Sequence, residues 1–489
     1  MDELMAQRVA KLEQLRELGI DPYPPRAART HSAAEANALI EGFEADEPEV
    51  DPIDVAGRVV AFRKMGKAAF IDLMDGSGRI QALVQRHVVG DEAFDRLKLV
   101  DLGDIIGVHG NPMRTRTGQP SVKAHTWTML TKALHAPPEK YHGLADAEIR
   151  QRRRYLDLMA NEETRRVFTM RSQIVSGIRR FLDGRGFLEV ETPVLQEEAG
   201  GAAARPFQTH FDALGEDRFL RISLELYLKR LVVGGFDRVY ELGRIFRNEG
   251  FSAKYNPEFT MLETYEAYAD YNDVARMVED MVTTVAKDVL GSLACTFRDQ
   301  EIDLTPPWRR LSFYDALKEY GDLDLAAFPD AASLEKELRR RDVPIPDDVG
   351  YGKLADEAMS HYVEPQLIQP TFLLDYPVEL SPLAKRKPEN PRLVERFEVF
   401  MGGFEVGNAY TELNDPLDQR ERFEEQLRLR AAGDEEAEMI DEDFIFALEH
   451  GMPPAGGLGI GIDRLVMILT GQPSIREVIL FPQLRSEKR

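Results

Sequence analysis

The chain has 489 residues, of which 43% are hydrophobic and 30% charged, so composition indicates an ordinary globular protein of about two to four domains. Its only cysteine, Cys295, excludes an intrachain disulfide and indicates a reducing compartment. The net charge of −23 excludes a protein that coats nucleic acid with its whole surface, so any RNA contact must use local basic patches.

Residues 1–53 are expected to form a helical extension that docks against a partner domain. Apolar residues near helical spacing predict an amphipathic helix over residues 2–19, namely Leu4, Val9, Leu12, Leu15 and Leu18. The segment is charged throughout and lacks an apolar signal core. No apolar run approaches about 20 residues, so we expect a cytoplasmic protein without a membrane span.

Residues 54–135 predict a small all-β domain. Short alternating strands are expected at 54–64, 68–75, 78–85, 104–112 and 120–130. A hairpin turn is predicted at Asp75-Gly76-Ser77-Gly78, and a helix at 91–100 separates the third strand from the fourth. Five strands with one interposed helix is the pattern of an OB-fold barrel, whose face binds single-stranded nucleic acid.

Three side chains of this domain are candidates for that face. Arg63 would supply charge, Phe70 stacking and Gln81 hydrogen bonding. A single strand aromatic is more often a core residue, so the pattern alone favours the core for Phe70.

Residues 136–160 read as a linker stiffened by Pro137-Pro138. A basic run follows at Arg150, Arg152, Arg153 and Arg154. It fits an RNA backbone contact, a subunit contact or a solvated helix face, and the sequence does not choose among these. A long helix is expected over 161–190, leading into a strand that stops at Pro193.

The most informative stretch is Val239–Tyr268, which predicts two strands joined by a polar loop. Alternation places Phe259, Met261, Glu263 and Tyr265 on one face of the second strand. A core hairpin would not show such a charged face. The pattern favours a nucleotide cradle that also receives a cation, over a salt-bridged surface hairpin.

This stretch resembles a known signature. Phe246-Arg247-Asn248-Glu249 followed by Asn256-Pro257-Glu258-Phe259-Thr260 is similar to the second motif of class II aminoacyl-tRNA synthetases, and Glu263 with Tyr265 to their lysyl-tRNA synthetase branch. The 161–193 segment resembles the first motif. The glycine-rich run Gly456–Arg464 resembles the third, and the three motifs stand in the family's order.

The resemblance implies a multidomain α+β protein. An N-terminal OB-fold β-barrel would grip the tRNA anticodon through Arg63, Phe70 and Gln81. A class II catalytic domain over 161–489 would follow, built on an antiparallel β-sheet flanked by helices and carrying a helical insertion at 291–365. Two copies would form a homodimer through the first motif.

The resemblance also implies an ATP site. Arg247 would bridge the substrate carboxylate and the α-phosphate, and Arg464 would face the γ-phosphate, so both are candidate catalytic residues. Glu249 would orient the adenine amino group and Phe259 would stack on the base. Two further residues, Tyr255 and Asn256, complete the predicted ATP site. Tyr255 stands where the family usually has histidine, and Lys254 where arginine is common.

The implied lysine pocket uses six residues. Gly201 and Glu225 would hold the α-amino group, and Asn408 would contact the carboxylate. A buried ammonium must be paired and offers three donors. The three acceptors would be Glu263, Tyr265 and Glu412. Leu224, beside Glu225, stands where the family usually has proline.

Mg²⁺ is the implied cofactor, held by Glu398 and Glu405 against the ATP phosphates. Both lie in a predicted hairpin that turns at Met401-Gly402-Gly403. Strict alternation places Glu405 on the opposite face from Asn408, unless Gly407 allows a β-bulge.

The activity that the resemblance implies has two steps. L-lysine would react with ATP to form lysyl-adenylate and pyrophosphate, and lysine would then pass to the 3′ acceptor end of tRNA. The alternatives are an aspartyl or asparaginyl synthetase, an enzyme that lysylates a protein, and a catalytically silent RNA-binding regulator. The Glu263 and Glu412 pair argues against an aspartate pocket, which needs cationic residues.

Overall fold

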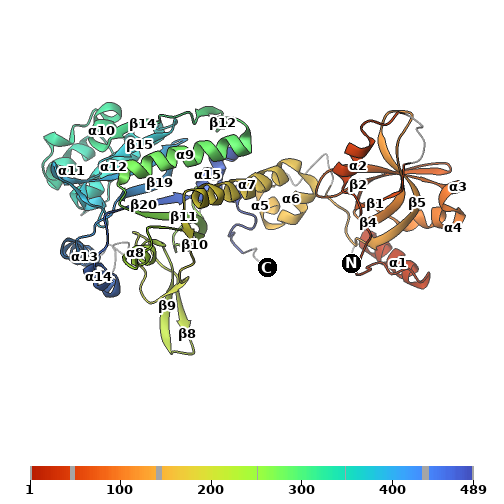
Figure 1. Cartoon of the computed structure of the whole chain (residues 1–489), viewed down its shortest axis with the longest axis horizontal. Coiled ribbons are helices and arrows are strands. Elements are labelled where there is room, and N and C mark those ends of the chain that lie inside the picture. The colour runs from red at the N-terminus through yellow and green to blue at the C-terminus, as the bar shows by residue number, and fades with distance from the viewer. Residues whose placement is uncertain are drawn as a thin grey trace. The chain divides into compact units, whose positions relative to one another are not determined.

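The computed structural model describes residues 3–44, 50–138, 146–250, 252–346, 349–431 and 440–486. The chain divides into two compact units, Met1–Ala145 and Asp146–Arg489, whose elements are labelled in Figure 1. The N-terminal extension groups with the barrel. The described part of the expected linker beyond residue 145 groups with the second unit.

The first unit is the predicted OB-fold. Its strands close into a barrel in the order β1-β2-β3-β5-β4. They are β1 (Ile53–Met65), β2 (Ala68–Met74), β3 (Arg79–Gln85), β4 (Ile105–Arg114) and β5 (Pro120–Thr131). Between β3 and β4 lie α3 (Arg86–Val89) and α4 (Asp91–Arg96). Asp75 closes the predicted β2–β3 turn by accepting hydrogen bonds from the backbone N–H groups of Ser77 and Gly78.

The two N-terminal helices pack on this barrel. Leu15 of α1 (Glu3–Glu17) and Ile40 of α2 (Ala33–Ile40) are fully buried in the barrel core. Arg8 of α1 donates hydrogen bonds to the backbone carbonyls of Ala133 and Leu102. The extension therefore docks as expected, and the barrel is the domain it docks on.

The second unit is built on an eight-stranded sheet in the order β14-β15-β18-β19-β20-β11-β10-β6. Its strands are β14 (Arg309–Ser312), β15 (Thr371–Leu374), β18 (Arg396–Met401), β19 (Phe404–Thr411), β20 (Ala455–Gly461), β11 (Glu258–Ala267), β10 (Arg238–Phe246) and β6 (Leu188–Glu189). Neighbours from β15 to β10 are antiparallel, as expected. The outer pairs β14/β15 and β10/β6 are parallel, so the sheet is mixed at its edges.

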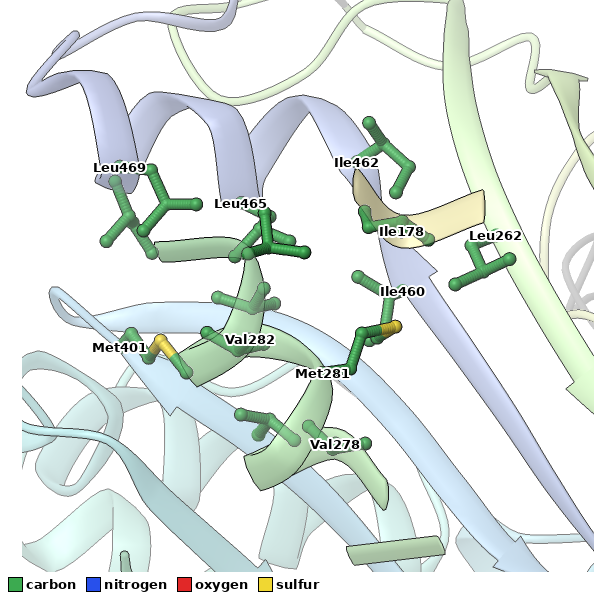
Figure 2. Close-up of a cluster of buried hydrophobic side chains, with 14 of the residues drawn as sticks. Ile178, Leu262, Val278, Met281, Val282, Met401, Ile460, Ile462, Leu465 and Leu469 are labelled. Atoms are coloured by element: carbon green, nitrogen blue, oxygen red, sulfur yellow. The ribbon is translucent and has the colours of Figure 1, made fainter. Parts of the chain in front are cut away.

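Three helices bury apolar faces in one core with this sheet: α7 (Glu162–Gly184), α9 (Tyr271–Leu290) and α15 (Ile462–Thr470). Figure 2 shows Ile178, Met281 and Leu465 from these helices packed around Leu262 of β11 and Ile460 of β20. Leu262 and Ile460 lie opposite each other across the two strands. Alternation then directs Glu263 and Gly459 to the other face, where the site lies.

That other face carries a second, smaller core. It includes residues of α8 (Glu225–Val233) and α14 (Glu442–Glu449), packed against Val239 and Tyr265 of the sheet. Before α14 comes α13 (Pro416–Ala431). A separate three-stranded sheet is formed by β7 (Leu195–Gln196), β9 (Glu216–Leu220) and β8 (Gln208–Phe211).

The insertion expected to be helical at 291–365 is only partly so. It holds α10 (Phe313–Gly321), α11 (Ala331–Arg340) and α12 (Tyr351–Tyr362) around a core of their own. It also holds a hairpin of β12 (Ala294–Phe297) and β13 (Gln300–Asp303). Four-residue strands are too short to show a clear period. Two further short strands, β16 (Arg386–Lys387) and β17 (Asn390–Val394), pair with each other.

The basic run at 150–154 serves mainly to hold the C-terminal segment. The run covers the end of α5 (Ala147–Arg152) and the start of α6 (Arg154–Ala160). Arg154, the first residue of α6, is fully buried. It pairs with Asp157 at 2.9 Å and donates to the carbonyls of Arg476 and Leu480. None of the three alternatives considered for this run describes Arg154. Among the described residues, no helix is long and apolar enough to cross a membrane.

Candidate functional site

Cross-strand pairing brings three predicted site residues into one row. Glu398 lies opposite Asn408, Asn408 opposite Gly459, and Gly459 opposite Glu263. Residues directly opposite each other in a sheet point to the same face. Residues of the β18–β19 hairpin and of β11, which is distant from it in the sequence, therefore meet on the face opposite the helical core.

The glycines of β20 form the floor of this site. In the next row, Gly457 lies between Tyr410 of β19 and Tyr265 of β11. A Cβ at Gly457 would overlap a carboxylate oxygen of Glu412 and lie 2.7 Å from the ring of Tyr265. Glycine is therefore required here because the Glu412 carboxylate lies directly over the strand.

Glu263 is held at both carboxylate oxygens. One oxygen accepts from the Ser223 hydroxyl at 3.0 Å and the Leu224 N–H at 2.9 Å, and the other from the Tyr265 hydroxyl at 3.2 Å. Burial, with the charge of Glu225 adding to it, raises the pKa of Glu263 to about 7. The departure at Leu224 thus supplies an N–H donor that proline lacks.

Beside Glu263 lies a buried ion cluster in which Glu225 and Glu412 were predicted from the sequence and Lys229 was missed. The Lys229 ammonium is fully buried, lies 2.5 Å from Glu225 Oε1, and also pairs with Glu412 Oε2. The Tyr410 hydroxyl donates to the same Glu225 oxygen at 2.6 Å. The Glu-to-Lys spacing of four on a helix was the available signal for Lys229.

Burial sets the protonation of this cluster. Burial opposes a charge on Lys229, but Glu225 and Glu412 outweigh it and keep the pKa of its ammonium above the ordinary value. Burial raises the pKa of Glu412 well above its usual range, against the opposing charge of Lys229. Oε1 of Glu412 is buried and has no hydrogen-bond partner within the described part of the chain. An unpaired buried oxygen of this kind suits an incoming ammonium.

Gly201 borders the same cluster. Its φ of +82° is a left-handed conformation that glycine adopts without strain. A Cβ there would lie 3.1 Å from Ser223 Oγ and 3.1 Å from Glu225 Cβ. The structure thus brings five of the predicted lysine-pocket residues together in one buried patch: Gly201, Glu225, Glu263, Tyr265 and Glu412.

Arg247 lies next to this patch, in the loop that follows β10. Its Nε donates to the carbonyl of Ile222 at 3.4 Å, and its guanidinium lies 5.3 Å from the ring centre of Phe259. Burial lowers the pKa of Arg247, while Glu249, Glu405 and Glu263 oppose that shift. Arg247 is therefore a partly buried cation with acidic residues around it.

Arg464, in the first turn of α15, joins two predicted phosphate-site residues. It donates to the backbone carbonyl of Glu405 at 2.6 Å and to its carboxylate at 3.2 Å. Its guanidinium lies 5.6 Å from the ring centre of Tyr255, which is half exposed. Tyr255 therefore contacts Arg464 through the face of its ring.

The bulge needed to place Glu405 is present. Val399 pairs with Gly407, but the next residue, Phe400, pairs with Glu405, so the β19 register shifts by one residue. Glu405 therefore shares the face of Glu398 and Asn408, and strict alternation would have placed it wrongly.

Glu398 and Asn408 are both held by Arg396, another residue missed from the sequence. Arg396 lies 2.6 Å from Glu398 Oε1 and donates to Asn408 Oδ1 at 2.9 Å. Burial raises the pKa of Glu398 to about 8, with Arg396 opposing and Glu405 adding to the shift. Because the Asn408 oxygen is occupied by Arg396, its NH₂ group is left to donate.

Glu398 and Glu405 fit one mode of magnesium binding, in which the ion is shared with a substrate. Within the described ranges, no group of three His, Cys, Asp or Glu side chains could hold a metal ion by itself. Mg²⁺ is commonly bound by one or two carboxylates together with substrate phosphates and water. Glu398 and Glu405 match that mode, and do not match a metal enclosed by protein ligands.

Two residues of the predicted ATP site, Asn256 and Glu249, have surroundings that differ from those of the residues above. Asn256 is buried, its NH₂ donates to the Glu258 carbonyl at 2.5 Å, and its oxygen accepts from the Gln483 N–H. It therefore shapes the loop and fixes the C-terminal segment. Glu249 lies exposed in the loop after β10.

The barrel carries its predicted residues on the side of the strands that faces away from its core, where Arg63 is exposed, Phe70 half buried and Gln81 buried. Arg63 lies opposite Phe70, and Asp72 opposite Gln81. The Gln81 amide donates to Asp72 at 3.2 Å and accepts from the Ser121 hydroxyl at 3.1 Å. Phe70 is half buried and lies outside the barrel core that contains its neighbours Ala69 and Ile71. The core alternative for Phe70 therefore fails.

Comparisons with known proteins agree with this geometry. A family model described as tRNA synthetases class II (D, K and N) matches residues 146–485, and one described as an OB-fold nucleic acid binding domain matches 53–130. A lysine–tRNA ligase of Dehalococcoides mccartyi (strain 195) is 53% identical over 99% of this chain and 98% of its own length. That of Roseiflexus castenholzii is 54% identical over 99% of both chains. That of Moorella thermoacetica is 53% identical over 100% of this chain and 99% of its own.

Proposed function

The chain belongs to the class II tRNA synthetases as a member of the lysine–tRNA ligases, and on this basis we propose which residues carry out each step. It is an aminoacyl-tRNA synthetase, which activates lysine with ATP and transfers it to tRNA.

The observation that carries the assignment of the lysine pocket is its charge. Glu225, Glu263 and Glu412 lie together with Lys229 as their only paired cation among the described residues. With all three carboxylates ionised, the cluster has a net charge of −2. The two ammonium groups of lysine balance that charge, and its carboxylate can pair with Arg247. An aspartate side chain would need an unpaired cation here, and Lys229 is already paired twice.

In the proposed arrangement, Glu225 and the Gly201 carbonyl receive the α-amino group. Glu263, Tyr265 and Glu412 receive the side-chain ammonium. Asn408 donates its NH₂ to the substrate carboxylate, since Arg396 occupies its oxygen. These contacts hold the carboxylate still for attack on the α-phosphorus.

The protein contributes positioning and charge to the first reaction, because no covalent enzyme intermediate is needed. The lysine carboxylate attacks the α-phosphorus while the bond to pyrophosphate breaks. Arg247 neutralises charge on both reacting groups with its fork of donors. Arg464 holds the γ-phosphate end, and Phe259 stacks on the adenine, whose amino group Glu249 orients. Tyr255 supports ATP binding through Arg464.

Glu398 and Glu405 would hold Mg²⁺ at the phosphates, and the ion when bound supplies charge neutralisation for the departing pyrophosphate. Arg396 keeps Glu398 in place for this role. Burial raises the pKa of Glu398, and a cation bound beside it would favour its ionised form.

Further parts of the proposal concern the tRNA and the cell. Arg63, Phe70 and Gln81 on the outer face of the barrel bind the anticodon, and the catalytic unit receives the acceptor end. A cytoplasmic location follows from a tRNA substrate and is consistent with the single free cysteine.

The proposal also includes a homodimer through the first motif. β6 is an edge strand of the large sheet, and apolar side chains lie exposed on it and just after it: Leu188 at 47%, Val194 at 40% and Leu195 at 49%. A second copy would cover them.

This part of the proposal is tested by measuring the mass of the protein in solution. The wild type should be a dimer, and Leu188→Glu should shift the equilibrium toward the monomer. A monomeric wild-type protein would remove this part.

The decisive experiment is pyrophosphate exchange into ATP, run with each of the twenty amino acids and no tRNA. We expect exchange with lysine alone. Exchange with aspartate or asparagine would overturn the pocket assignment and leave the fold unaffected. A folded protein that exchanges with none would favour a silent regulator.

A further inference from the structure

We propose that Lys229 is a positioning residue that makes the pocket selective for an amino acid with two ammonium groups. This inference rests on the proposed function, because it concerns the carboxylates assigned to lysine. Lys229 does not touch the substrate in this proposal. It acts through Glu225 and Glu412.

The geometry of Lys229 differs from that of a simple internal ion pair. One ammonium joins Glu225, assigned to the α-amino group, with Glu412, assigned to the side-chain ammonium. It contacts Oε1 of the first and Oε2 of the second. Oε1 of Glu412 has no hydrogen-bond partner within the described residues. Lys229 therefore fixes both carboxylates and leaves an oxygen of Glu412 unpaired.

The surroundings of Lys229 hold it in one place. It is fully buried on α8, and its ammonium lies 5.5 Å from the ring centre of Tyr410 and 5.7 Å from that of Phe444. Both rings can stabilise a cation with their faces. These contacts hold the ammonium between two carboxylates and two aromatic rings.

The charge count explains selectivity. Without Lys229 the ionised cluster would have a charge of −3, so its carboxylates would hold protons more tightly than they do now, in competition with the substrate ammonium. With Lys229 the charge is −2, which two ammonium groups balance. An amino acid with a neutral side chain leaves one buried charge unpaired, and is rejected for that reason.

The test is Lys229→Met, assayed by lysine-dependent pyrophosphate exchange without tRNA. We expect the KM for lysine to rise at least tenfold, with kcat within about threefold and the KM for ATP unchanged. Lys229→Arg should recover part of the lysine KM because it restores the charge. The ratio of the norleucine inhibition constant to the lysine KM should fall at least threefold in Lys229→Met.

The barrel offers a matched control. Lys132 is also fully buried and joins two carboxylates, Asp101 at 2.6 Å and Asp104 at 2.8 Å. Lys132→Met loses the same kind of buried ion contact in the other unit. Its lysine KM should equal that of the wild type, because exchange without tRNA does not use the anticodon face.

A stability measurement covers the case in which Lys229→Met folds poorly. Lys229→Gln keeps a hydrogen-bonding side chain, and its thermal midpoint can be measured with and without lysine. The lysine-induced rise should shrink in Lys229→Gln and stay unchanged in Lys132→Met.

An unchanged lysine KM, or a loss confined to kcat, would overturn the role of Lys229. Equal increases in the KM for lysine and ATP would also overturn it, as a sign of general disturbance. Wild-type protein that does not exchange with lysine would instead sink the proposed function, so the two failures are distinguishable.

Discussion

Glu263 is the residue on which the proposed recognition of lysine most depends. It is buried, and the hydroxyl of Tyr265 beside it completes the acceptor set. Glu263→Gln keeps the shape and removes the charge. We expect it to cost about 2–4 kcal/mol of transition-state binding, the scale for a lost buried charge partner. The measurement is kcat/KM for lysine in pyrophosphate exchange, and an unchanged value would remove Glu263 from the pocket.

The pKa of Glu263 gives a pH prediction with a definite sign. Burial raises that pKa to about 7, so below pH 7 the free pocket keeps a proton that the lysine ammonium must displace. Lysine affinity should therefore rise with pH up to about 7 and then level off, with protons released on binding. Between about pH 4.5 and 7 Glu263 is more protonated in the free folded protein than in the unfolded chain, so its contribution to the stability of the free protein should fall as pH rises.

Calorimetry of lysine binding in two buffers of different ionisation enthalpy measures the released protons directly. Omitting ATP and Mg²⁺ keeps the titration of Glu398 out of the result. Glu263→Gln should release fewer protons than the wild type. Equal release from both proteins would contradict the assignment, and would point to Glu412.

The contact between Tyr255 and Arg464 changes the role that we propose for Tyr255. From the sequence it was an ATP ligand of uncertain chemistry, and the structure places its ring 5.6 Å from the Arg464 guanidinium. Tyr255→Phe should keep the KM for ATP within about twofold, because the ring face remains. Tyr255→Ala should raise it severalfold, in line with the roughly 0.5–1 kcal/mol of an exposed cation–π contact. A large effect of Tyr255→Phe would show that the hydroxyl is used.

Among the elements, β20 could be predicted as a glycine-rich strand, but the neighbours of each glycine could not. From the sequence, its glycine-rich run was recognisable only as a resemblance to the third class II motif. Only the pairing of Gly457 with Tyr265 and Tyr410 shows which glycine borders the proposed lysine pocket. The position of Glu405 depended on a bulge that alternation cannot locate. Lys229 was missed because a lysine four residues after a glutamate usually marks a solvated helix face.

Gly457→Ala tests β20. The added methyl group would overlap the Glu412 carboxylate and lie 2.7 Å from Tyr265. We expect the KM for lysine to rise at least tenfold in pyrophosphate exchange. Gly461→Ala is the matched control for the fold, because its methyl group would meet only ordinary contacts of 3.7–3.9 Å. Its thermal midpoint should stay near that of the wild type, and an unaffected lysine KM in Gly457→Ala would contradict the crowding argument.

At the scale of the whole molecule, the sequence predicted the order of the two units and the chemistry of each. Three signature motifs in series and five barrel strands were enough for that. It was harder to predict which unit each connecting segment packs on, because this depends on contacts between residues that are distant in the sequence. The N-terminal extension joined the barrel core through Leu15 and Ile40, and Arg154 became buried against the C-terminal segment. A local pattern does not record which distant surface a side chain meets.

The division into units predicts that anticodon and lysine variants affect different assays. With a net charge of −23, the protein must bind tRNA through local cations, and we propose Arg63 as one of them because its side chain is 59% exposed. Its guanidinium lies 3.5 Å from one carboxylate oxygen of Asp72. Phe70→Ala should weaken tRNA binding by about 1–3 kcal/mol, the scale for losing one stacked base. Pyrophosphate exchange without tRNA should stay at the wild-type rate.

Salt dependence separates stacking from charge on the same face. The affinity for tRNA falls with salt in proportion to the number of phosphates that cations neutralise. Phe70→Ala should therefore keep the wild-type slope of log affinity against log salt, because no charge is lost. Arg63→Ala should make that slope shallower by about one ion if Arg63 contacts a phosphate. An unchanged slope with weakened binding would mean that Arg63 reads a base, and an unchanged affinity in both variants would place the anticodon elsewhere on the barrel.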